Sequence, residues 1–263
     1  MSQARSASPG SAALARASAR RPPRARSSAR WRGGLTGRGF ARDLATLLLL
    51  TGVLLVLDAG ATLVWQEPVS AIYTSVRQAE LSAQLAALEG EAPTQLQVSA
   101  LAQLPTVRSR IAYLAHELER TAPDGAPIGR IRIPRIDADF VLIKGTSVHD
   151  LQEGPGIYSQ TSLPGAAGTT AIAGHRTTYL APFRHIDELV PGDIVSVDMP
   201  YGRFVYSVIG HEVVKPTDVA VIEPVGYSRL VLSACTPLYS AADRLIVFAR
   251  LVRIDPLGSA RLT

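Results

Sequence analysis

The chain has 263 residues, 47% of them apolar, which is enough for one domain with a substantial core plus additional segments. Its net charge of +5 is unevenly distributed, because the first 42 residues hold ten arginines and no carboxylate, leaving 17 basic and 22 acidic residues after them. A uniformly basic protein is therefore excluded, and so is an intramolecular disulfide, because Cys235 is the only cysteine.

Residues 1–43 are predicted to be a basic, disordered tail in the cytoplasm. The segment is rich in serine, alanine, arginine, proline and glycine and has no apolar periodicity. An excess of arginine directly before an apolar segment is typical of the cytoplasmic side of a membrane. Nucleic-acid binding is not expected, because nothing resembling a DNA-reading fold follows the tail.

Residues 44–65 are predicted to form a single transmembrane helix, in which Asp58 is the only charged residue. At 1.5 Å per residue the segment reaches about 33 Å, enough for a bilayer core of about 30 Å. The preceding arginines place the N-terminus in the cytoplasm and the rest of the chain outside the cell membrane. A cleaved signal peptide is the alternative, because residues 59–61 (A-G-A) resemble an A-x-A cleavage site.

Residues 66–127 are predicted to be a helical juxtamembrane stalk and linker. Leucines 81, 85 and 88 recur at helical spacing, and apolar residues at 107, 111, 114 and 118 indicate a second amphipathic helix. These apolar stripes pack either on the main domain or on one another. The sequence A-P-D-G-A-P at 122–127 is a turn-rich boundary.

Residues 128–255 contain short runs rich in valine, isoleucine, phenylalanine and tyrosine, separated by glycine and proline. They predict a mainly β domain with one short helix at 182–189 and a C-terminal tail at 256–263. Seven or eight strands in about 130 residues indicate a closed barrel or a sandwich. The predicted strands are 131–133, 140–144, 169–173, 194–199, 204–214, 230–234 and 245–253.

Cys235 ends the predicted strand R-L-V-L-S-A-C, and Pro237 follows two residues later. Because proline cannot donate to a strand ladder, the strand stops near this point and the thiol lies at the rim of the β domain. A buried structural cysteine is the alternative interpretation. An unpaired thiol in an oxidising extracytoplasmic space favours a reactive cysteine.

His175 and Arg244 are the candidate partners of the thiol. His175 follows an apolar strand in A-I-A-G-H-R, where it can act as an acid and base at the rim, and Arg176 is expected to mark the exit to solvent. Arg244 begins the last strand nine residues after Cys235. If a hairpin joins the two strands, its guanidinium emerges near the thiol and can bind a developing oxyanion.

From Ile128 to Val252 the chain resembles sortases, the enzymes that attach proteins to the Gram-positive cell wall or polymerise pilins. A-I-A-G-H-R is similar to the histidine motif of the family, V-L-S-A-C stands in the place of T-L-x-T-C, and the Cys-to-Arg spacing is that of several sortase classes. The basic tail, single span and V-W-Q-E-P stalk resemble actinobacterial class E sortases. Val231 and Ala234 depart from the usual threonines, so substrate contacts near the thiol are not carried over.

The resemblance implies a closed eight-stranded barrel with short helices, following the transmembrane helix and stalk. It also implies that Cys235 is the nucleophile, His175 the acid and base, and Arg244 the third catalytic residue. The reaction implied is cleavage of an L-P-x-T-G-like or L-A-x-T-G-like C-terminal sorting motif through a thioacyl enzyme. The partners are secreted proteins bearing that motif and an amine of a peptidoglycan precursor or a pilin. No metal or cofactor is expected.

Three alternatives remain beside this interpretation. A papain-like peptidase places cysteine before histidine and commonly uses asparagine, whereas here His175 precedes Cys235 and the chain has no asparagine. An L,D-transpeptidase shares the order and the wall location, but its S-x-G-C-x-R motif is absent. The third alternative is a non-catalytic, membrane-tethered binding or assembly protein on a sortase-like barrel, which an inert thiol would indicate.

Overall fold

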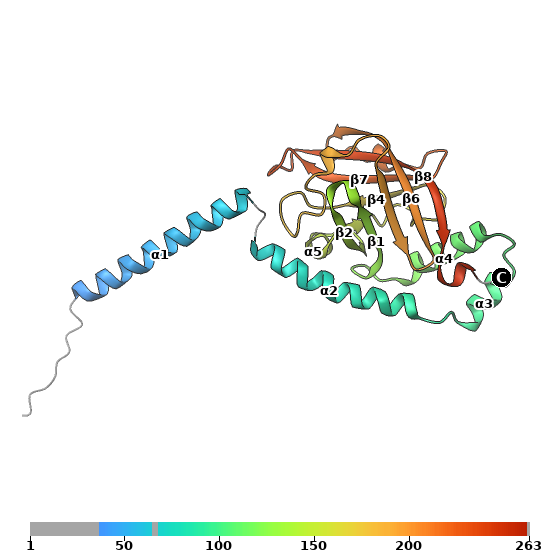
Figure 1. Ribbon diagram of the computed structural model, residues 1–263, viewed down its shortest axis with the longest axis horizontal. Coiled ribbons are helices and arrows are strands. Elements are labelled where there is room, and N and C mark those ends of the chain that lie inside the picture. The colour runs from blue at the N-terminus through green and yellow to red at the C-terminus, as the bar shows by residue number, and fades with distance from the viewer. Residues whose placement is uncertain (1–36, 65–67, 262–263) are drawn as a thin grey trace, which may run out of the picture. The chain divides into compact units, whose positions relative to one another are not determined.

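The protein is described by a computed structural model over residues 37–64 and 68–261 (Figure 1). Residues 1–36 of the predicted tail therefore lie outside the described residues, as do 65–67 and 262–263. Helix α1 (Gly37–Val64) contains the stretch Gly39–Ala61, the only helix in the described part of the chain that is long and apolar enough to cross a membrane. The helix begins seven residues before the predicted span, because the residues from Gly37 to Asp43 include no proline to interrupt it.

Eight strands form a closed barrel in the order β1-β2-β3-β4-β7-β8-β6-β5, which confirms the predicted barrel and excludes the sandwich (Figure 1). Strands β2 and β3, and strands β4 and β7, pair in parallel, and the remaining pairs are antiparallel. The strands are β1 (Pro127–Ile133), β2 (Ala138–Lys144), β3 (Gly156–Ile157), β4 (Thr169–Ala173), β5 (Ile194–Met199), β6 (Gly202–Val214), β7 (Arg229–Thr236) and β8 (Asp243–Pro256).

Alternate side chains of the strands point to opposite faces of the barrel wall, as the period of two requires. In β7, Leu230 and Leu232 belong to the core inside the barrel. Val231 lies between them in sequence and packs in a separate cluster with Ala171 of β4 and Ile246 of β8. This second cluster therefore lies on the outer face of strands β4, β7 and β8, which is the face that matters for the site described below.

Helix α2 (Pro68–Gly90) packs along the barrel, which decides where the apolar stripe of the predicted stalk lies (Figure 1). Leu81 and Leu85 are buried in a cluster with two residues of β2. The side chain of Gln78 bonds both backbone groups of Val141 on β2: its Oε1 accepts from the amide at 2.8 Å, and its Nε2 donates to the carbonyl at 3.3 Å. The helix thereby supplies both apolar cover and hydrogen-bond partners to the edge of β2.

The remaining helices cover the barrel or connect its strands. Helices α3 (Gln95–Ala102), α4 (Val107–Thr121) and α5 (Val148–Glu153) are short, and Ile111 of α4 belongs to the barrel core. The helix predicted at 182–189 is present only as the 3-10 turn Ile186–Glu188. In the predicted C-terminal tail, Ala260 is buried in the core.

Candidate active site

Cys235 and Arg244 are cross-strand neighbours at the end of the β7–β8 hairpin. The antiparallel register pairs them directly, and it pairs Thr236 with Asp243 at the last rung. Directly paired residues carry their side chains on the same face with Cβ atoms about 4.5–5.5 Å apart. Val231 points outward, and residues 231, 233 and 235 of a strand share one face. The side chains of Cys235 and Arg244 therefore lie on the outer face of the barrel.

His175 reaches the same level from the neighbouring strand. Strand β4 runs parallel to β7 with Ala173 opposite Ser233, and the Gly174 amide donates to the Ser233 carbonyl at 3.1 Å. Two residues beyond the Ala173–Ser233 pair on this register, just past the end of β4, His175 comes level with Cys235. The three predicted residues therefore lie side by side across β4, β7 and β8, although His175 is 60 residues before Cys235 in the sequence.

Gly174 fixes the backbone before His175 by close packing. A Cβ atom at position 174 would lie 2.6 Å from the ring of Phe183, which is fully buried in the core. The Phe183 amide also donates to the carbonyl of His175 at 3.0 Å. Only a residue without a side chain allows this ring to pack against the strand end, so Gly174 and Phe183 together hold the histidine backbone.

The thiol and the imidazole open into a pocket of about 330 Å³. His175 and Cys235 line one part of it, and Tyr239, Ser240 and Ala241 of the β7–β8 loop line another. Cys235 is half-buried, so a ligand can reach its sulfur. Burial lowers the pKa of His175 below its ordinary value of 6.5, so its imidazole is neutral at pH 7 and can accept a proton.

Arg244 does not line this pocket, but it hydrogen-bonds the β7–β8 loop that forms one of its walls. Its Nη1 donates to the carbonyls of Ala241 and Asp243, both at 3.1 Å. These bonds occupy one nitrogen of the guanidinium. Within the part of the chain that the structure describes, the N–H groups of Nε and Nη2 make no hydrogen bond to protein, so they can bind oxygen atoms of a ligand beside Cys235.

Arg176 is buried, so the expectation that it marks an exit to solvent is wrong. Its Nη2 contacts Asp187 at 2.7 Å, its Nε and Nη2 donate to the Arg184 carbonyl at 3.2 and 3.1 Å, and its Nη1 reaches the Thr236 hydroxyl at 3.4 Å. The residue after His175 is thereby linked to the residue after Cys235. No sequence signal marks this role, because the fold alone brings these partners together.

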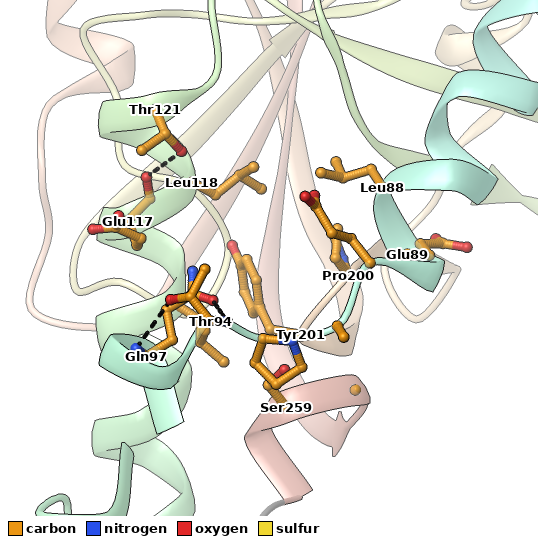
Figure 2. A pocket seen from close by; sticks show the side chains of 15 residues that line it. Leu88, Glu89, Thr94, Gln97, Glu117, Leu118, Thr121, Pro200, Tyr201 and Ser259 are labelled. Carbon is orange, nitrogen blue, oxygen red and sulfur yellow. Dashed lines mark hydrogen bonds between the residues drawn. The ribbon is translucent and has the colours of Figure 1, made fainter. Parts of the chain in front are cut away.

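A second cavity, of about 390 Å³, lies away from the thiol, at the end of α2 and beside α4 (Figure 2). Three of its polar side chains make local bonds: Thr94 and Gln97 cap α3, and the Thr121 hydroxyl donates to the Glu117 carbonyl (Figure 2). It is lined by neither cysteine nor histidine. The pocket beside Cys235 is therefore the better candidate for chemistry.

Comparison with known proteins identifies the region that carries this site. Residues 131–252 match the family model described as a sortase domain. The chain is 30% identical over 132 residues to Sortase D of Bacillus subtilis, covering 49% of this chain and 65% of that protein. It is 32% identical over 153 residues to Sortase SrtE1 of Streptomyces coelicolor, covering 52% and 44%. The match thus spans about half of this chain, 65% of Sortase D and 44% of Sortase SrtE1, which is less than two thirds of either relative.

Among solved structures, the SrtF sortase from Corynebacterium diphtheriae is similar with a TM-score of 0.50 and 27% identity. The similarity covers 53% of this chain and 91% of that chain. The covered share of this chain is about the length of the segment from β1 to β8, which forms the barrel. Together with Sortase SrtE1, these relatives bear out the predicted resemblance to actinobacterial sortases, including class E.

Proposed function

Because the chain belongs to the sortase family, we propose that it is a membrane-anchored cysteine transpeptidase whose nucleophile is Cys235. In this proposal His175 is the acid and base, and Arg244 stabilises negative charge. The observation that supports it most is the placement of these three residues at one level of strands β4, β7 and β8, on one face. They come from three separate sequence segments, so their proximity is a property of the fold.

The first half-reaction forms a thioacyl enzyme. The neutral imidazole of His175 takes the thiol proton, and the Cys235 sulfur attacks the carbonyl carbon of a peptide bond in the substrate. The carbonyl oxygen becomes an oxyanion, which Arg244 stabilises through its unoccupied N–H groups. When the intermediate collapses, the C–N bond breaks, and the imidazolium gives its proton to the leaving amine.

The second half-reaction transfers the acyl group to a new amine. An uncharged amino group attacks the thioester carbonyl, and His175 accepts the proton that this nitrogen loses. The C–S bond then breaks, a new amide bond is left on the acceptor, and the Cys235 thiolate recovers the proton from the imidazolium. The two half-reactions balance without an external oxidant, reductant or cofactor.

The outer face beside Cys235 suits an extended apolar peptide. Ala171, Val231 and Ile246 are buried there, and Phe248 and Ile222 are partly buried against them. A segment of the L-P-x-T-G or L-A-x-T-G kind has apolar residues before its polar end, so its apolar part can contact the partly exposed Phe248 and Ile222, which cover the buried cluster, while a backbone carbonyl approaches the thiol. The proposed substrates are secreted proteins that bear such a C-terminal motif.

The proposed acceptor is an amine of a peptidoglycan precursor or a pilin lysine, and the similarity to class E relatives favours wall anchoring. Helix α1 serves as the membrane anchor in this proposal. The arginine-rich segment before it places the N-terminus in the cytoplasm and the barrel outside the cell. Nucleic acid is not among the proposed partners.

Transpeptidation of sorting-motif peptides by the full-length protein in detergent tests this proposal. The expected product joins the peptide to an added amine, and Cys235→Ala and His175→Gln abolish it. His185→Gln is the matched control, because His185 is exposed and pairs with Glu188 outside the pocket. Unchanged turnover by Cys235→Ala would refute the assignment, and an inert thiol in the unmodified protein would favour a non-catalytic binding protein.

A further inference from the structure

The loop that follows His175 has a strained backbone. Tyr179, Leu180 and Ala181 have φ angles of 53°, 61° and 41°, so three consecutive residues other than glycine adopt the left-handed conformation. L-amino acids rarely adopt this conformation, because the Cβ atom approaches the following carbonyl oxygen. Such a turn persists only where the surroundings hold it, and strain of this kind clusters at functional sites.

The first turn of helix α2 holds this loop. The Oγ of Ser70 accepts a hydrogen bond from the Tyr179 amide at 3.1 Å, across 109 residues of sequence. Ser70 is only 8% exposed, which makes it one of the few buried polar residues of the helix. The Ala181 amide closes the turn by donating to the Thr178 carbonyl at 2.8 Å.

The next two turns of α2 fix the position of Ser70. Thr74 is fully buried, and its hydroxyl donates to the Gln152 carbonyl at 2.8 Å. Arg77 donates through Nε and Nη2 to the buried carboxylate of Glu153 at 2.9 and 2.7 Å. The helix is therefore attached to α5 over the two turns that follow its contact with the strained loop, and it cannot rotate away from the loop without breaking these bonds.

The ring of Tyr179 contacts the catalytic candidate. The centroids of the Tyr179 and His175 rings are 5.3 Å apart, and their planes are inclined by 35°. This separation is within the range of favourable aromatic contacts. The ring also removes solvent from one side of the imidazole, in keeping with the burial that lowers the pKa of His175.

We propose that Tyr179 is a positioning residue for His175 and that Ser70 holds Tyr179 in place. Three residues separate the end of α1, the proposed membrane anchor, from the start of α2 at Pro68, so the first turn of α2 is part of the working site. This inference rests on the proposed function and deepens it. It assigns to the juxtamembrane helix a role in catalysis beyond holding the barrel at the membrane.

Steady-state kinetics of the full-length protein test the contact with Ser70. Ser70→Ala is expected to lower kcat about tenfold with KM changed less than twofold, because a misplaced acid and base slows chemistry rather than binding. Ser75→Ala is the matched control on the same helix, since Ser75 is exposed and bonds only within α2. Equal kcat values for the two variants would overturn the proposal, and so would a loss that merely follows a lower thermal midpoint.

The pH dependence of Cys235 alkylation tests the ring contact without any peptide substrate. Tyr179→Leu should expose the imidazole and move the acid limb of the alkylation profile to higher pH, and Tyr179→Phe should restore it. The other groups around the imidazole are Cys235, Arg176, Arg244 and Tyr239, and none of them changes between the variants.

Superimposable profiles for Tyr179→Leu and the unmodified protein would refute the positioning role. Failure of the proposed function would be seen separately, as an absence of transpeptidation by the unmodified protein. In that case the alkylation profile still reports whether Tyr179 positions His175.

Discussion

Gly174→Ala is a severe test of how the histidine is positioned. The added Cβ would lie 2.6, 2.9 and 3.0 Å from three carbon atoms of the Phe183 ring. Carbon atoms at their optimal separation are about 3.5 Å apart or slightly more, so the ring or the strand end must move by about 1 Å. Phe183 is fully buried and has no free space to enter, so the substitution should lower the free energy of unfolding by about 1–3 kcal/mol.

The same movement should reduce activity more than stability. His175 follows Gly174 directly, and its carbonyl is bonded to the Phe183 amide, so a shift of either partner displaces the imidazole. A misplacement of about 1 Å in a catalytic group can cost about 100-fold in rate. Urea denaturation gives the stability change, and transpeptidation under conditions where the variant is folded gives kcat.

Gly210→Ala is the matched control, because a Cβ at that position on β6 has nothing within 4 Å. The double variant Gly174→Ala/Phe183→Leu should recover part of kcat, since the smaller side chain relieves the clash. If Gly174→Ala were as stable and as active as Gly210→Ala, the steric account of the strand end would be refuted.

The remaining predictions concern charge, pH and helix docking. Asp187→Ala should lower the free energy of unfolding by about 1–2 kcal/mol in urea denaturation, because buried Arg176 loses its carboxylate partner while Asp187 itself is half exposed. An unchanged free energy of unfolding would contradict a stabilising ion pair. Below pH 6.5 unfolded His175 binds a proton that the folded residue excludes, so stability should fall as the pH falls from 6.5 toward the lower folded pKa, and His175→Gln should remove this contribution. Gln78→Ala should lower the free energy of unfolding by about 1–3 kcal/mol, because it leaves two backbone groups of β2 unpaired, whereas Gln84→Ala on the exposed side of α2 should not change it. Equal thermal midpoints for the two variants would refute this prediction.

The strand pattern made most of the barrel predictable. The run before Cys235 is apolar and ends near Pro237, and β7 indeed ends at Thr236. Strand β3 was not predicted, because it has only two residues, Gly156 and Ile157, and no alternation can be recognised over such a length. Helix α5 was also missed, although Ser147 begins a capping box there with Asp150.

The partners of the site residues were less predictable than the residues themselves. The register that places Arg244 opposite Cys235 follows from a hairpin between adjacent strands, which sequence reasoning can anticipate. The burial of Arg176 depends on a backbone carbonyl and on Thr236, which only the closed barrel brings together. Likewise, Ser70 reads as an ordinary polar residue of a helix, and its contact with Tyr179 spans a distance in sequence that no local pattern encodes.

The most direct test of the central claim is mass spectrometry of the full-length protein after incubation with a sorting-motif peptide. The account predicts a thioacyl adduct whose mass equals the N-terminal part of the cleaved peptide and which maps to Cys235. The adduct should be released by an added amine as the transpeptidation product, and it should be absent from Cys235→Ala. Formation of the same product by Cys235→Ala, or cleavage of the peptide with the acyl group on another residue, would contradict the account.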